Sequence, residues 1–188
     1  MPPTVPRPLL ALTAAALLAA CSPTFNWREV PIAESGLTAL LPCKADRANR
    51  ALPLGAESVQ VDMTGCEAGG ATFAIAHASA NGPAQAQAWL GAWRAATRGQ
   101  LSGSGGAAGA EEPAGAQLTE APATLQRATA TPAPLRLDAR KPGAGQVQVL
   151  WFAQSQKDGT VALYQATVLG TPSSSEASQT FFEGLRLP

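Results

Sequence analysis

The amino-acid sequence predicts an α+β domain built on a mostly antiparallel β-sheet that is flanked by helices. Three observations lead to this fold class: segments with alternating apolar and polar residues, a late Asp-Gly hairpin signal, and one long Ala-rich segment with helical spacing. Hairpin strands interrupted by a helix are typical of α+β proteins. After the N-terminal residues, the length predicts a single folded domain over 27–188.

Four segments in the first half of the chain have strand patterns: 27–32, 37–41, 58–63 and 71–78. The second segment ends at Pro42, because proline has no N–H to give to a strand ladder. Residues 44–50 are polar and are expected to be solvated. The Gly-rich residues 65–70 are expected to turn the chain between the last two strands, which places Cys66 in a connection.

The longest expected helix spans 84–98. The preceding Asn81-Gly82-Pro83 is a start signal, since an N-cap type residue is followed by a proline near the first turn, and Gly99 is the expected end. Trp89 and Trp93 lie one helical turn apart, on a stripe that can pack against a sheet. The pair is expected either to join the core or to form an exposed aromatic binding patch.

The second half of the chain begins with a Gly/Ala-rich segment, 102–115, which is expected to be a flexible loop. Strand patterns follow at 116–119, 125–130, 135–138, 146–156 and 160–169. The last two are predicted to form a long hairpin, because Asp158-Gly159 supplies the positive φ that a tight turn needs. A short helix that opens at 171–176 carries Phe181 and Phe182, and the C-terminal residues are expected to pack on the sheet.

The two ends of this domain carry short motifs. One is Leu41-Pro42 at the end of an early strand, and the other is the closing Phe181-Phe182-Glu183-Gly184-Leu185-Arg186-Leu187. Both motifs resemble the ends of exported PsbP-like domains, in which Phe-Pro often stands where this chain has Leu41-Pro42. The resemblance implies an α/β/α sandwich over about 27–188. Relatives of this kind differ in function, so no catalytic residue is carried over.

The N-terminal residues have the pattern of an export signal. Arg7 and the amino terminus supply positive charge, and Leu9–Leu18 is an unbroken run of Leu, Ala and Thr. This run is about half as long as the roughly 20 apolar residues that a membrane-spanning helix needs. Residues 1–20 are therefore predicted to be a signal peptide.

The signal ends in Leu18-Ala19-Ala20-Cys21, which resembles the bacterial lipobox. The resemblance implies cleavage before Cys21, a diacylglycerol on its sulfur and a short tether at 21–26. Ser22 resembles the signal that lets such lipoproteins leave the inner membrane. The expected location is the bacterial cell envelope, lipid-anchored to the outer membrane and facing the periplasm. The alternative is an ordinary secretory signal with an incidental cysteine.

Two cysteines remain once Cys21 is assigned to lipid. Cys43 and Cys66 would lie in a compartment where thiols oxidise, which predicts a structural disulfide that stabilises the fold by roughly 3 kcal/mol. A redox or metal site is the alternative, but the pair is not Cys-x-x-Cys, and His77 is the only histidine in the chain. We therefore expect no metal or other cofactor.

Few other residues are candidates for chemistry. Gly103–Ala108 matches the G-x-G-x-x-A pattern of dinucleotide loops, but it follows a helix instead of joining a strand to a helix. Glu111 and Glu112 lie in the same loop, where solvated charge is the expected role. His77 shares a strand face with large apolar residues and is expected to be partly buried near a strand end, where it is a candidate general base.

The charge balance bears on partners. The chain has 13 basic and 13 acidic residues without a basic cluster, so nucleic acid is not an expected partner. The sequence predicts a non-enzymatic, membrane-anchored periplasmic lipoprotein that acts as a binding or envelope-assembly accessory, with an envelope protein as candidate partner. One alternative is a small-ligand binder or enzyme with a pocket near His77, and Trp89 and Trp93 are further candidate binding residues. Another is a passive structural lipoprotein.

Overall fold

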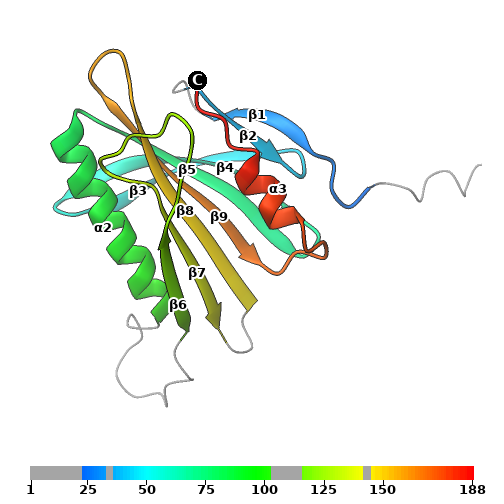
Figure 1. The fold of residues 1–188 in the computed structure, drawn as a ribbon. Coiled ribbons are helices and arrows are strands. Elements are labelled where there is room, and N and C mark those ends of the chain that lie inside the picture. Colours follow the sequence, from blue (N-terminus) through cyan, green and yellow to red (C-terminus); the bar gives the residue numbers. More distant parts are fainter. Residues whose placement is uncertain (1–22, 33–35, 103–115, 142–144) are drawn as a thin grey trace, which may run out of the picture.

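The computed structural model describes residues 23–32, 36–102, 116–141 and 145–188. Its main feature is a seven-stranded antiparallel sheet in the order β3-β4-β5-β9-β8-β7-β6, and a two-stranded sheet is formed by β1 and β2 (Figure 1). The predicted fold class, an α+β domain with a mostly antiparallel sheet flanked by helices, is thereby confirmed. The lipobox with Cys21, the Gly103–Ala108 pattern and the Glu111/Glu112 pair lie outside the described residues.

The elements follow one another as β1 (Arg28–Ile32), β2 (Leu37–Leu41), β3 (Asp46–Leu54), β4 (Glu57–Ala68), β5 (Ala71–Ala80), α2 (Pro83–Ser102), β6 (Gln117–Pro122), β7 (Leu135–Lys141), β8 (Gly145–Ser155), β9 (Val161–Gly170) and α3 (Ala177–Glu183). Among the described residues, no helix is long and apolar enough to cross a membrane.

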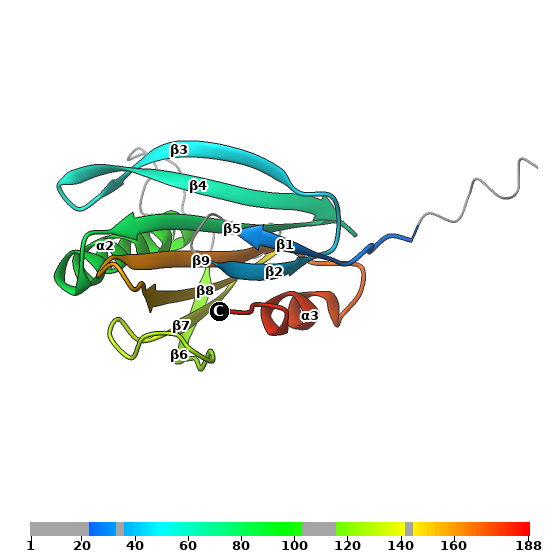
Figure 2. The ribbon, with the colours of Figure 1, turned by 90° about the horizontal axis from the view of Figure 1, so that it is seen from above.

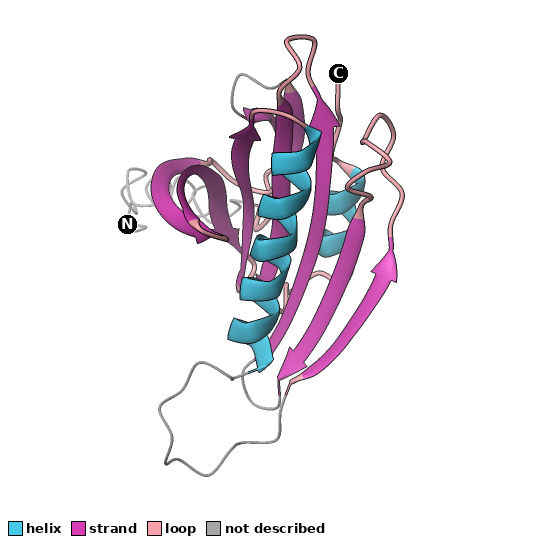
Figure 3. Cartoon of the chain, turned by 90° about the vertical axis from the view of Figure 1, so that its left-hand side faces the viewer, coloured by secondary structure: helices cyan, strands magenta, loops and turns pink. Residues whose placement is uncertain are grey.

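The main sheet is covered on both faces. Helix α2 lies on one face, and α3 lies on the other together with the β1–β2 hairpin (Figures 2 and 3). Successive residues of a strand point to opposite faces, so Trp151 of β8 packs on the α2 side and Phe152 on the α3 side. The sheet therefore separates two apolar cores.

Strand β5, next to the central strand β9, has a small-residue face and a large-residue face. Ala76, Ala78 and Ala80 belong to the core beneath α2, together with Trp89 and Trp93 of the helix. Small strand residues let the helix approach closely, and the two indole rings fill the space that remains. The stripe predicted for this helix is thus part of the core.

Edge strands and helix ends differ from the prediction. Residues 46–50 are exposed, as predicted, but they also form the start of β3, an edge strand that pairs only with β4. Residues on both faces of β3 are exposed over 46–50, so this part of the sequence lacks the apolar–polar alternation that would predict a strand. Residues 125–130, expected to be a strand, belong to the loop between β6 and β7. Helix α2 continues past Gly99, its predicted end, to Ser102.

Strand β4 is longer than predicted, because it continues through residues 65–68. Within 65–70, only Gly69 and Gly70 have positive φ, and they turn the chain. Gly65 lies within the strand, where a Cβ would be 2.6 Å from the carbonyl oxygen of Phe73, so glycine is required there by close strand packing. Cys66 therefore lies in a strand and not in a connection, which corrects the prediction.

Candidate functional site

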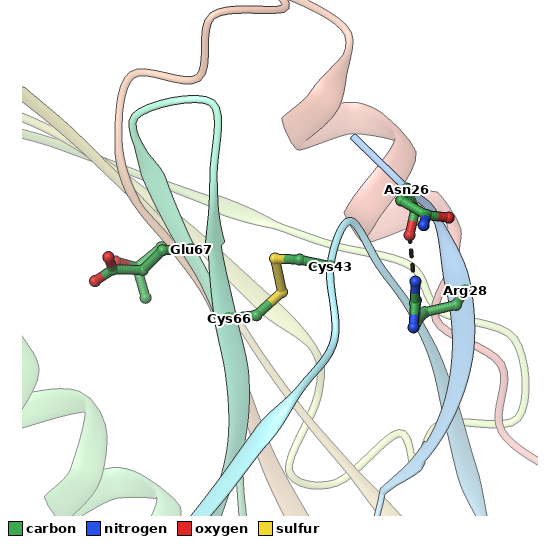
Figure 4. Close-up of a disulfide and its surroundings, with 6 residues drawn as sticks. Asn26, Arg28, Cys43, Cys66 and Glu67 are labelled. Atoms are coloured by element: carbon green, nitrogen blue, oxygen red, sulfur yellow. Dashed lines mark hydrogen bonds between the residues drawn. A yellow bond between two sulfur atoms is a disulfide. The ribbon is translucent and has the colours of Figure 1, made fainter. Parts of the chain in front are cut away.

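Cys43 and Cys66 form the predicted disulfide, with their Cα atoms 5.9 Å apart (Figure 4). Cys43 follows β2 and Cys66 belongs to β4, so the bond ties the end of the small hairpin to the main sheet. Cys66 is buried in the core on the α3 side, while the neighbouring Glu67 points away from the bond (Figure 4). This placement fits a structural disulfide.

His77, the candidate general base, lies in the interior of β5 and not near a strand end as predicted. It is 8% exposed and pairs in register with Asp62 on one side and Tyr164 on the other. Neither ring nitrogen has a hydrogen-bond partner among the described residues. Burial lowers the pKa of His77, and the nearby Asp62 carboxylate only partly opposes this shift. The neutral imidazole is thus packed as a core side chain.

Trp89 and Trp93, the other candidate binding residues, are 7% and 4% exposed. The indole N–H of Trp89 donates a hydrogen bond to Oε1 of Glu57 at 3.0 Å. An exposed aromatic patch is therefore wrong for this pair, because the helix stripe faces the sheet. Trp93 does line an apolar pocket of about 330 Å³ beneath the C-terminal half of α2.

A larger cavity, of about 730 Å³, opens on the α3 side of the sheet. It lies between the loop 123–134, strands β7 and β8, the end of α3 and the C-terminal residues, and we call it the arginine cleft. It is lined by Ala123, Thr124, Leu125, Gln126, Arg127, Arg136, Leu150, Phe182, Glu183, Leu185, Arg186 and Leu187. Neither this cleft nor the α2 pocket is lined by His77.

Arg136 is the most firmly held of the three arginines. Its Nε and Nη2 donate hydrogen bonds to the two carboxylate oxygens of Asp138, at 3.0 and 3.2 Å. Gln148 donates a further bond to the same carboxylate, at 3.1 Å. The guanidinium carbon lies 4.6 Å from the ring centre of Phe182. One edge of the guanidinium is thus fixed, whereas Nη1 makes no hydrogen bond within the described part of the chain.

The other two arginines come from the loop and the C-terminal residues. Arg127 is exposed and has a φ of 65°, which is uncommon for a residue with a side chain. Arg186 pairs through its backbone with Thr38 of β2, and its guanidinium donates to the carbonyl oxygens of Glu183 and Leu185. Three arginines and one glutamate, Glu183, are therefore among the residues that line the cleft.

The loop 123–134 has a defined position on the sheet. Its ends meet because β6 and β7 are paired, and such compact loops are frequently functional. The backbone N–H of Thr129 donates to the carbonyl oxygen of Ala153 at 2.8 Å, and Arg94 of α2 donates to that of Ala133 at 2.7 Å. The loop wall of the cleft is thus held in place before any ligand binds.

Metal binding has no support from the described residues, which contain no group of three or more His, Cys, Asp or Glu side chains that could hold an ion.

Sequence reasoning missed the arginine cleft, because its charged residues are far apart along the chain. Only the fold brings 127, 136 and 186 together.

Comparison with known proteins adds no family. A scan against protein-family models finds no match, and a search of curated proteins finds no significantly similar sequence. The resemblances to lipoproteins and to PsbP-like domains stay predictions. Fold and site together define an α+β domain with a cationic surface cleft.

Proposed function

We propose that this chain is a lipid-anchored protein of the bacterial cell envelope whose folded domain is a non-catalytic binding module. The arginine cleft is its binding site, and the three arginines that line it beside apolar side chains are the observation that carries the proposal. The export signal and the lipobox at Cys21 support the location. A helix on each face of the sheet is compatible with the α/β/α sandwich of PsbP-like domains.

The cleft chemistry fits a ligand that has an anionic group and a hydrocarbon part. Guanidinium groups match carboxylates and phosphates, and Arg136 is already oriented by its contacts with Asp138 and Phe182. Apolar side chains, among them Leu125 and Leu150, lie beside these charges. An anionic amphiphile can therefore place its charge on the arginines and its hydrocarbon on these apolar side chains.

Binding suits this cleft better than catalysis. Arginine stays protonated at neutral pH and does not act as a base there. Glu183 is exposed and accepts a hydrogen bond from Gln179 at 2.8 Å. The described lining contains neither histidine nor cysteine, so it lacks the usual pairs of nucleophile and base.

The ligand class is tested by isothermal titration of a soluble form that begins at Ser22, with octyl phosphate, inorganic phosphate and octyl glucoside as probes. We expect octyl phosphate to bind most tightly and the neutral octyl glucoside not to bind. Arg136→Met should weaken the binding of octyl phosphate by about tenfold to a hundredfold, since a hydrogen bond between charged groups contributes about 1.5–3 kcal/mol. Arg50→Met, on the exposed part of β3, is the matched control. Equal binding of octyl glucoside, or no effect of Arg136→Met, would overturn the assignment.

The anchor is tested separately by mass spectrometry of the N-terminal peptide from cell membranes. The expected peptide begins at Cys21 and carries the mass of a diacylglyceryl group with an added acyl chain. Cys21→Ala should move the protein from the membrane to the soluble fraction. An unmodified Cys21 in wild-type protein would refute the lipid anchor.

A further inference from the structure

Residues 25–27, which precede the first strand, are docked on the surface of the domain. The backbone N–H of Asn26 donates to the carbonyl oxygen of Pro42 at 2.7 Å. Phe25 stacks on Trp27, with 6.0 Å between ring centres, and both rings meet Phe73 of β5 edge-on at 6.5 and 6.2 Å. These contacts fix the direction in which the chain approaches the domain.

Two other segments meet the tether at the same end of the molecule. A Cβ on Gly69, in the β4–β5 turn, would lie 2.3 Å from Cζ of Phe25 and 2.7 Å from Oγ of Ser173. The N–H of Ser173 donates to the carbonyl oxygen of Gly69 at 2.7 Å. The tether, the β4–β5 turn and the β9–α3 connection are therefore packed together. Figure 2 shows the blue segment that precedes β1 at this end of the molecule and the β3–β4 turn at the opposite end.

Chain length limits how far the anchor can be from this end. Cys21 precedes Pro23, the first described residue, by two positions, which span at most about 7 Å when extended. A long flexible linker would leave the domain able to take many orientations. Here the docked residues 25–27 leave only a short segment between the lipid and the folded surface.

We propose that the anchor holds the domain with this end against the membrane, so that 67–72 and 170–176 form a surface facing the phospholipid headgroups. The β3–β4 turn and the Asp158-Gly159 turn then point away from the bilayer. This orientation rests on the proposed lipidation of Cys21, but not on the ligand of the arginine cleft.

The exposed residues at this end of the domain are suited to contact a lipid surface without electrostatic attraction. These residues are small and mostly uncharged, as in Thr171 and Ser173, and the charged side chains among them, Glu67 and Glu176, are both acidic. Lysine and arginine clusters are what draw proteins to anionic membranes. The orientation is therefore set by the lipid and the docked tether, and is independent of anionic lipid.

The test uses the full lipidated protein in phosphatidylcholine vesicles, with and without phosphatidylglycerol. A fluorophore is attached to one added cysteine, either Ser175→Cys near the tether or Ala56→Cys in the far β3–β4 turn, with the native disulfide intact. Nitroxide on lipid headgroups should quench the label at 175 severalfold more than the label at 56, in both lipid mixtures. Equal quenching, or stronger quenching at 56, would overturn the orientation.

A second variant separates docking from anchoring. A flexible Gly-Ser insertion between Ser22 and Pro23 keeps the lipid and the fold but lengthens the tether, so the two labels should become nearly equally quenched. An unchanged quenching ratio would overturn the role of the tether. Flotation with the vesicles reports lipidation itself. Protein that does not float refutes the anchor and the orientation together, whereas floating protein with equal quenching refutes only the orientation.

Discussion

The guanidinium carbon of Arg136 lies 4.6 Å from the ring centre of Phe182. Both residues line the arginine cleft, and their contact links β7 to the end of α3. Arginine stacks on aromatic faces and still has N–H groups for an anion. The hydrogen bonds to Asp138 limit the remaining freedom of the side chain. A ligand would therefore meet a preorganised cationic group, which lowers the entropic cost of binding.

Arg136→Lys tests this preorganisation. Lysine keeps the charge but loses both the planar stack on Phe182 and the paired bonds to Asp138. We expect octyl phosphate to bind about fivefold to tenfold more weakly, while the free energy of unfolding changes by less than about 1 kcal/mol, because the ion pair is partly exposed. Titration calorimetry and urea unfolding measure the two effects. Wild-type affinity in this variant would show that charge alone is sufficient.

Removal of the disulfide tests its structural role. The double substitution Cys43→Ala/Cys66→Ala should reduce the free energy of unfolding by roughly 3 kcal/mol, because the bond restricts the unfolded chain. Urea unfolding of this variant and of reduced wild-type protein should agree. Octyl phosphate should still bind the folded variant, since neither cysteine lines the arginine cleft. A loss of affinity in folded protein would link the bond to the site.

His77 predicts a dependence of stability on pH. Because burial lowers its folded pKa below 6.5, the unfolded state binds more protons in mildly acidic solution. Stability should therefore fall as the pH drops below about 6.5, by at most about 1.4 kcal/mol per pH unit for this group. His77→Leu should remove this part of the slope between about pH 7.5 and 5.5. Parallel slopes for both proteins, measured by urea unfolding, would contradict the packed neutral histidine.

Two glycines with opposite surroundings test the packing of α3. A Cβ on Gly184, at the end of α3, would lie 2.4 Å from Cβ of Leu40 in β2, so Gly184→Ala should cost about 1–3 kcal/mol. Gly91 lies in α2 with open space around it, so Gly91→Ala should stabilise the protein by about 0.5–1 kcal/mol. Thermal and urea unfolding compare both variants with wild type. A neutral Gly184→Ala would mean that α3 does not pack on β2 as described.

Local patterns in the sequence predict the central elements well. The β8–β9 hairpin is predicted by Asp158-Gly159 between two segments rich in β-branched and aromatic residues. Helix α2 is predicted by its start signal and its apolar stripe. Local sequence patterns do not predict the conformation of residues whose structure depends on tertiary contacts. Gly65 is a strand residue required by close packing, although glycine often marks a turn. Residues 125–130 are predicted to be a strand, but Leu125 and Ala128 instead pack the β6–β7 loop against the core on the α3 side.

The candidate site was beyond sequence reasoning for a related reason. Arg127, Arg136 and Arg186 come from a loop, a strand and the C-terminal residues, so no spacing along the chain connects them. By contrast, His77 and Trp93 stand out in the sequence because their types are rare or periodic, and the fold uses both for packing. The disulfide was predictable, because pairing two cysteines requires only their number and the compartment.

The most direct test of anion binding in the arginine cleft is an NMR titration of the ¹⁵N-labelled domain with octyl phosphate, with octyl glucoside as the neutral reference. Backbone and guanidinium signals of Arg127, Arg136 and Arg186 should shift with saturation, and Arg136→Met should suppress these shifts while the signals of β3 stay unchanged. Shifts spread evenly over the domain, or identical shifts with octyl glucoside, would contradict an anion site in this cleft.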